Sequence, residues 1–294
     1  MILSTQTETM ARQFGMEPGI RVLAAAGFDA LDFTMEDALK PEHPLHGDDG
    51  DAWAERMRQA AADCGVFFNQ AHAPMGYAGV HDLAVYAPEV VPLMKRMLRY
   101  AGRMGVKTLV IHPIHYCACG GDRARCRREN MRLYGALLPD AEKYGVRIAT
   151  ENMWNIDRRR GYIIDDTCSC AEEMAQYVDE MDSPFFTACL DLGHCGLVGR
   201  EAQDMLRALG ARVGALHVHD NDYIHDSHTA PFLGKMDWNA ITQALADIHY
   251  AGDFTFEADN FYRGYDAEML PEAAGFLCAT GRHLIAKVNA AREK

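Results

Sequence analysis

The stretch Tyr144-Gly145-Val146-Arg147-Ile148-Ala149-Thr150-Glu151 contains the unit that decides the fold. A helical pattern ends at Gly145, and a short run with branched apolar residues follows at once and ends in a carboxylate. Glycine suits this junction because it adopts the left-handed conformation at the end of a helix at little cost. The same junction recurs at 26–28 and 104–106. The repetition predicts helices alternating with parallel strands.

Eight short apolar or β-branched runs bounded by glycine, aspartate or proline are predicted strands. They are Met1–Thr5, Phe28–Phe33, Gly65–Ala71, Val106–His112, Val146–Glu151, Phe185–Asp191, Val213–His219 and Phe254–Glu257. Helical patterns cover Glu17–Gly27, Val90–Gly105, Asn130–Gly145, Ala171–Met181, Glu201–Gly210 and Trp238–Gly252. The strand centres lie about 36 residues apart, close to one unit of a βα barrel. We expect one (β/α)8 TIM barrel over residues 1–294, because the first strand lacks the Gly-x-Gly-x-x-Gly turn of a doubly wound sheet.

Composition limits the partners. The 294 residues are 49% apolar, enough for a large core, and carry a net charge of −13, which opposes binding to a polyphosphate backbone. No run of about 18 apolar residues occurs, and the chain start lacks the features of a secretory signal. We therefore expect a cytoplasmic protein without a membrane or nucleic-acid partner. The nine cysteines are scattered, and Cys117, Cys119 and Cys126 lack a fourth ligand at zinc-finger spacing, so reduced thiols are expected.

Polar side chains stand at the carboxyl ends of most predicted strands, and these ends converge on one mouth in a barrel. They are His72, His112, Glu151, Asp191 with His194, His217 with His219, and Glu257. Carboxylates and imidazoles suit one divalent ion, Mn²⁺, Zn²⁺, Co²⁺ or Mg²⁺, and the absence of thiolates argues against a structural zinc site. One inward histidine is commonly a hydrogen-bonded core residue. Carboxylates at three strand ends favour a metal site instead.

Five residues at or near these ends have two interpretations each. Alternation places His217 and His219 on the same face of their strand, so either can bind the metal while the other meets a substrate. Asp226 and His228, in the following loop, either reach over the mouth or belong to a solvated loop. Trp154 either lines the pocket or belongs to the core.

The ordered motifs resemble the sugar phosphate isomerase/epimerase superfamily of xylose-isomerase-like TIM barrels, which includes endonuclease IV. The motifs are Ile111-His112-Pro113, Glu151-Asn152, Asp191-Leu192-Gly193-His194, His217-Val218-His219-Asp220, Asp226-x-His228 and Phe256-Glu257. The resemblance implies that Glu151, Asp191, His217 and Glu257 bind the metal. His217 is preferred over His219 because the family's His-x-x-Asp pattern matches it through Asp220.

The resemblance also implies an isomerase or epimerase of sugars or sugar phosphates. Glu151 and Glu257 would be the catalytic acid and base, transferring a proton through a metal-stabilised enediolate. The substrate would be a small sugar or polyol, and a homo-oligomer is expected. The implied substrate-binding residues are His72, His112, His194, His219, Asp226, His228 and Trp154.

Three other functions compete with this interpretation. Nine of the polar residues follow the order of the three-zinc ligand set of endonuclease IV, but the net charge of −13 opposes DNA binding. A sugar or inosose dehydratase would use the same site and expel a hydroxyl. A metal-free binding barrel would have lost a carboxylate, and none is lost.

Two arginine clusters are expected in loops on the catalytic face, where they either bind a substrate anion or form a solvated charge run. They are Arg123, Arg125, Arg127 and Arg128, and Arg158, Arg159 and Arg160.

Overall fold

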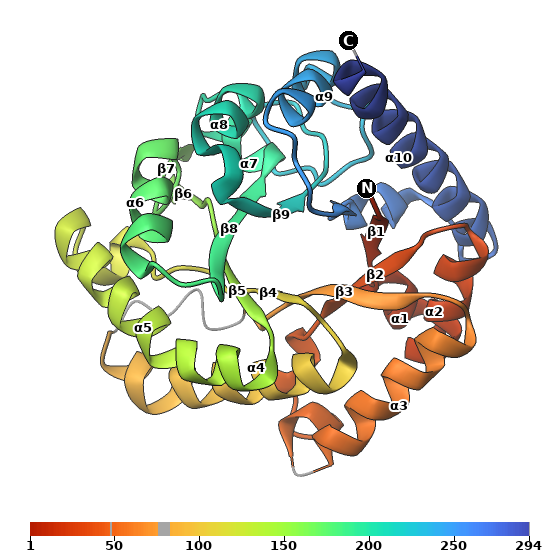
Figure 1. Cartoon of the computed structure of the whole chain (residues 1–294), viewed down its shortest axis with the longest axis horizontal. Coiled ribbons are helices and arrows are strands. Elements are labelled where there is room, and N and C mark those ends of the chain that lie inside the picture. Colours follow the sequence, from red (N-terminus) through yellow and green to blue (C-terminus); the bar gives the residue numbers. More distant parts are fainter. Residues whose placement is uncertain (48, 76–82, 294) are drawn as a thin grey trace.

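A ring of parallel strands forms the centre of the computed structural model, which describes residues 1–47, 49–75 and 83–293 (Figure 1). The strands are hydrogen-bonded in the order β10-β1-β2-β3-β4-β5-β8-β9. Their bounds are β1 Leu3–Gln6, β2 Ala30–Thr34, β3 Phe67–His72, β4 Thr108–Val110, β5 Arg147–Glu151, β8 Phe186–Asp191, β9 Val213–His217 and β10 Phe254–Phe256. These eight strands confirm the eight predicted ones.

A parallel bridge between Val218 and Phe256 closes the ring between β9 and β10. The backbone N–H of Val218 donates to the carbonyl oxygen of Thr255 at 2.9 Å, and the N–H of Glu257 donates to that of Val218 at 3.1 Å. The fold is therefore a (β/α)8 barrel, as predicted.

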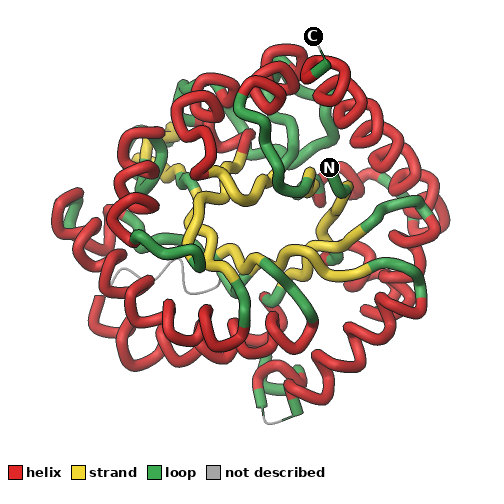
Figure 2. Tube along the Cα trace, in the orientation of Figure 1, coloured by secondary structure: helices red, strands yellow, loops and turns green. Residues whose placement is uncertain are grey.

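Helices form an outer layer around the strands, as Figure 2 shows. Their bounds are α1 Glu8–Phe14, α2 Met16–Ala25, α3 Gly50–Asp63, α4 Val91–Met104, α5 Arg123–Tyr144, α6 Ala171–Met181, α7 Leu192–Leu197, α8 Ala202–Leu209, α9 Trp238–Asp247 and α10 Leu270–Arg292. Gly105 and Gly145 end α4 and α5 in the left-handed conformation, with φ of 82° and 66°, which confirms their predicted role. Within the described ranges, no helix is both long and apolar enough to cross a membrane. The nine cysteines are free thiols.

Two connections differ from the sequence prediction. Helix α5 begins at Arg123 rather than Asn130, because the side chain of Asp122 caps it by accepting a hydrogen bond from the N–H of Arg125 at 2.9 Å. The first arginine cluster therefore lies in a helix, and its assignment to a loop is wrong. The second cluster lies at the turn of an unpredicted antiparallel hairpin, β6 Trp154–Asp157 and β7 Tyr162–Asp165. Helices α1, α3, α7 and α10 were not predicted either.

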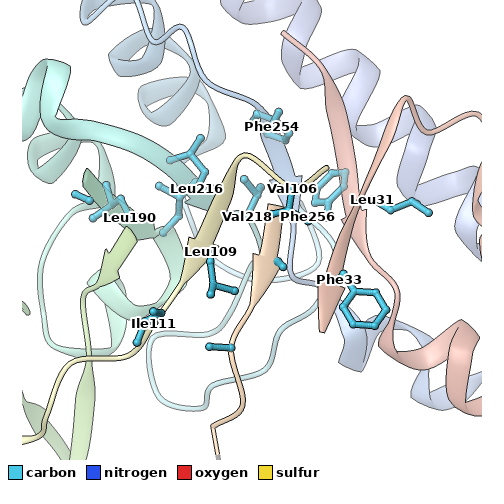
Figure 3. Close-up of a cluster of buried hydrophobic side chains, with 14 of the residues drawn as sticks. Leu31, Phe33, Val106, Leu109, Ile111, Leu190, Leu216, Val218, Phe254 and Phe256 are labelled. Atoms are coloured by element: carbon cyan, nitrogen blue, oxygen red, sulfur yellow. The ribbon is translucent and has the colours of Figure 1, made fainter. Parts of the chain in front are cut away.

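The core has two layers on opposite faces of the strands. The outer layer fills the space between strands and helices, and Figure 3 shows Leu31, Phe33 and Phe254 within it. A smaller inner layer consists of Val110, Ala149, Cys189 and Ala215. Successive residues of a strand face opposite sides, so the residue two positions beyond each inner one points inward again. These residues are His112, Glu151, Asp191 and His217.

Candidate metal centre

Four buried side chains meet at the carboxyl end of the barrel. Glu151, Asp191 and His217 end β5, β8 and β9, and Glu257 follows β10. Each offers a ligand atom that lies within 4.8 Å of those of the other three. Nδ1 of His217 lies 3.3 Å from Oε1 of Glu151 and 3.1 Å from Oε2 of Glu257. Side chains from four strands therefore surround one point.

The three carboxylates of this group are buried and need a compensating positive charge. Burial raises the pKa of Glu151 and Glu257, but the histidines around them together outweigh burial and hold both pKa values below the ordinary glutamate value. These histidines are His217 for both groups, with His112 beside Glu151 and His228 beside Glu257. Among the described residues, Oε2 of Glu151 and both ring nitrogens of His217 have no hydrogen-bond partner. A divalent cation could be bound by these unpaired atoms, and its charge would replace that of a protonated histidine. The residues therefore fit a metal.

His72 and His112 flank the group on one side. Their Nε2 atoms lie 3.1 Å apart, and they are 3.5 Å and 3.2 Å, respectively, from Oε2 of Glu151. Nδ1 of His72 donates to the carbonyl oxygen of Ala73 at 2.8 Å, which leaves Nε2 as the inward-facing nitrogen. Burial lowers the pKa of His112, which favours its neutral form. Together with Glu151, the two imidazoles form a second group of potential metal ligands, called here the second set of donors.

A third set of donors lies on the other side and contains His194, His219, Asp226 and His228. Nδ1 of His194 donates to the carbonyl oxygen of Asn152, and Nδ1 of His228 donates to that of Glu257, both at 2.8 Å. Their Nε2 atoms therefore face Oδ2 of Asp226, at 3.6 Å and 3.1 Å. Backbone carbonyls fix the orientation of both rings in this way.

Asp226 makes His228 a cation. Burial lowers the pKa of His228, but the hydrogen bond with Asp226 and the nearby carboxylates outweigh burial and raise it to about 10. His219 stacks on His228 with ring centroids 3.9 Å apart, and its Nε2 lies 3.0 Å from both carboxylate oxygens of Asp191. His217 thus lies with the two glutamates, whereas His219 lies between Asp191 and His228.

The structure brings all the sequence-predicted site residues to this mouth. Trp154 lies at its rim at the start of β6, partly exposed, with its ring centroid 6.4 Å from that of His194 in an edge-on arrangement. Three members of the two arginine clusters pair with acidic side chains. Arg123 pairs with Asp165, Arg127 with Glu180 and Arg160 with Asp157.

Two supporting residues were absent from the predicted site. The side-chain amide of Gln6, at the end of β1, donates to Oε1 of Glu257 at 2.6 Å. Asn152 accepts from the N–H of Asp191 at 2.7 Å and donates to its carbonyl oxygen at 2.9 Å. Gln6 directly follows the first predicted strand, so the pattern of polar residues at strand ends could have identified it.

A family model described as Xylose isomerase-like TIM barrel matches residues 20–280. The chain belongs to this family. Among curated proteins, the chain is 26% identical over 234 residues to an uncharacterized protein of Sinorhizobium fredii, which covers 70% of this chain and 71% of that protein. It is 34% identical over 137 residues to the D-psicose 3-epimerase of Enterocloster bolteae, which covers 47% of this chain and 40% of that enzyme.

Solved structures share the fold of this family member over nearly its whole length. D-Psicose 3-epimerase from Clostridium cellulolyticum, crystallised with D-tagatose, has a TM-score of 0.74 at 18% identity and covers 97% of this chain and 99% of its own. An L-ribulose 3-epimerase has a TM-score of 0.73 at 16% identity and covers 99% of this chain and 96% of its own.

Proposed function

We propose that the protein is a divalent-metal-dependent epimerase or isomerase of ketoses or their phosphates. The observation that carries the proposal is the convergence of Glu151 and Glu257 with Asp191 and His217 on one buried point. The names of the similar proteins, which include psicose and ribulose 3-epimerases, support the substrate class.

Glu151, Asp191, His217 and Glu257 would hold the cation. When bound, Mn²⁺, Zn²⁺, Co²⁺ or Mg²⁺ supplies Lewis-acid polarisation of a carbonyl and the adjacent hydroxyl. The lowered pKa values of the two glutamates keep both carboxylates ionised at neutral pH, so each can accept a proton.

The two glutamates approach from different walls of the barrel, since β8 and β9 separate β5 from β10 in the ring. Inversion of a carbon next to a carbonyl needs one group to remove its proton and another to return a proton from the opposite face. Glu151 and Glu257 are proposed for these two roles. Gln6 holds the carboxylate of Glu257 in place, because its amide donates to Oε1.

The flanking histidines and Trp154 would bind the substrate. Nδ1 of His228 is held by the carbonyl oxygen of Glu257 and Nε2 by Asp226, so this ring would place a positive charge beside the substrate rather than a free N–H. Nε2 of His194 and Nε2 of His72 face inward, because the Nδ1 atom of each ring is fixed on a backbone carbonyl.

A second candidate is hydrolysis of DNA at abasic sites, as in endonuclease IV. It is favoured by the two further sets of donors beside the central one, His72 with His112 and Glu151, and His194 with His219, Asp226 and His228. The net charge of −13 opposes it, because a DNA-binding face neutralises several phosphates with basic side chains.

The test is hydrogen exchange with solvent. Protein stripped of metal is given Mn²⁺, Mg²⁺, Co²⁺ or Zn²⁺ in D₂O with D-fructose, D-psicose, D-tagatose and their phosphates, and NMR follows deuterium at the carbon next to the carbonyl. We expect metal-dependent exchange that Glu257→Gln slows by about 10³-fold. The control is Glu272→Gln, an exposed glutamate in the first turn of α10, which should leave the rate unchanged.

Exchange with none of the metals and ketoses would contradict the proposal. Loss of water from the sugar would instead identify a dehydratase. Cleavage of DNA containing an abasic site, without exchange, would identify the second candidate.

A further inference from the structure

An apolar cavity adjoins the donor sets on the same end of the barrel. Its volume is about 530 Å³, and it lies between the hairpin β6–β7 and the segment that follows β9. Its walls include Trp154, Ile156, Tyr162, Leu197, Tyr223 and Ile224. A volume of this size accommodates a ligand larger than a single monosaccharide.

Two residues of the cavity wall contact the third set of donors. Asp226 lines the cavity and also bonds to His228 in the third set of donors. Oδ1 of Asp226 is buried, and among the described residues it has no hydrogen-bond partner. Trp154 lines the cavity and presents its ring edge-on to His194. The cavity therefore adjoins the third set of donors, which flanks the candidate metal centre.

The wall formed by Tyr223 is held in a fixed position. Its hydroxyl donates to the carbonyl oxygen of Lys235 at 3.0 Å, and its N–H donates to Oδ1 of Asn221 at 3.0 Å. A methyl group on Gly196 would lie 2.4 Å from Cδ1 of Tyr223, so this glycine of α7 leaves room for the ring. Tyr223 also has φ of 67°, an unusual backbone conformation for a tyrosine that is retained where surroundings impose it.

Ile224 beside it is 61% exposed, and Ile156 and Tyr162 across the cavity are each 47% exposed. Apolar side chains gathered around a cavity beside a polar site mark a ligand-binding surface. A free ketose held at the candidate metal centre has no second ring to cover these side chains.

We propose that the substrate is a ketose that carries, at the end remote from its carbonyl, an O-linked substituent with a flat apolar ring face. The substituent lies in the cavity between Ile156 and Ile224, while the carbonyl end lies at the candidate metal centre. An aryl ring and a second sugar ring share this chemistry, because both present C–H or π faces to aromatic walls. This proposal rests on the proposed function, since that function supplies the ketose.

The experiment measures binding rather than turnover. Calorimetry on the Mn²⁺-loaded protein compares the Kd of D-fructose, 6-O-benzyl-D-fructose and 6-O-glucosyl-D-fructose. We expect at least one substituted ketose to bind about tenfold more tightly than D-fructose, because it buries apolar side chains that are now exposed. The benzyl and glucosyl compounds distinguish the two kinds of ring.

Matched variants locate the effect. Ile224→Ser should weaken the binding of the substituted ketose about fivefold and leave the Kd of D-fructose unchanged. Ile156→Ser, on the opposite wall, should have the same effect. Leu233→Ser is the control, because Leu233 is 58% exposed in the same β9–α9 connection but does not line the cavity.

Equal Kd values for the three ketoses would overturn the proposal. The proposal would also be overturned if the ratio of the Kd of D-fructose to that of the substituted ketose were the same in Ile224→Ser, Ile156→Ser and the control Leu233→Ser. Failure of the proposed function has a different signature, namely no deuterium uptake into any ketose while the preference in Kd persists.

Discussion

Asn152 joins two neighbouring strands at the candidate metal centre. It follows β5, and its side-chain amide satisfies both backbone groups of Asp191 at the end of β8. Asn152→Ala leaves these two buried groups without partners, so we expect the free energy of unfolding to fall by about 2–3 kcal/mol. Urea unfolding measures the change.

The control for this prediction is Asn239→Ala, on the exposed surface of α9, for which we expect a change within about 0.5 kcal/mol. An Asn152→Ala protein as stable as Asn239→Ala would show that the two hydrogen bonds between Asn152 and Asp191 contribute nothing to the stability of the fold.

The contact between Asp226 and His228 predicts a dependence of stability on pH. In the folded protein the pKa of His228 is about 10, above the ordinary value of 6.5. Its protonated form therefore stabilises the metal-free fold fully below pH 6.5, and this contribution is lost as the pH rises towards 10. Denaturant unfolding of the metal-stripped protein from pH 6.5 to 10 should show the decline.

Asp226→Asn should flatten this decline, because it removes the carboxylate that raises the pKa of His228. Asp222→Asn is the matched control, since Asp222 pairs with the exposed His225. An equal slope in wild type and Asp226→Asn would contradict the assignment.

The site residues that the sequence reveals are those with a chemical signature at a strand end. Glu151, Asp191 and Glu257 are charged groups after apolar runs, and the barrel explains their position. The role of Asn152 does not follow from its place in the sequence, because it depends on a contact with Asp191, 39 positions away. Such pairings arise from the lateral order of strands, which periodicity does not encode.

At the scale of elements, the glycine at each helix–strand junction makes a testable contribution. Gly145 ends α5 with φ of 66° and has open space around it, so Gly145→Ala suffers only the backbone penalty. We expect a loss of about 1 kcal/mol in the free energy of unfolding, measured by urea denaturation.

Gly135 offers the opposite case within the same helix. It lies inside α5 without a positive φ and also has open space, so Gly135→Ala should stabilise the protein by up to about 1 kcal/mol. If Gly145→Ala and Gly135→Ala changed the free energy of unfolding in the same direction, the role assigned to Gly145 would be contradicted.

The elements that sequence reasoning missed have weak hydrophobic patterns. The first turns of α5 are rich in arginine, and Cys126 and Asn130 are their buried residues, so no apolar stripe marks the start of the helix. The hairpin β6–β7 is an insertion after β5 and is only partly buried, so it lies outside the repeating βα unit.

At the scale of the whole molecule, even spacing was enough to predict the closed barrel. Eight strand–helix units of similar length place the eight carboxyl ends at one mouth, and the donors follow from this geometry. The cavity beside the mouth could not be predicted, because two connections of irregular conformation form it, one of them with Tyr223 at a positive φ.

The claim on which the account depends is that Glu151, Asp191, His217 and Glu257 bind one divalent cation together. The most direct measurement is an anomalous difference map from crystals grown with Mn²⁺. We predict a peak within bonding distance of all four side chains, and its loss in Asp191→Asn crystals grown in the same way. A map with no peak at this point, while the protein is folded and saturated with Mn²⁺, would contradict the account.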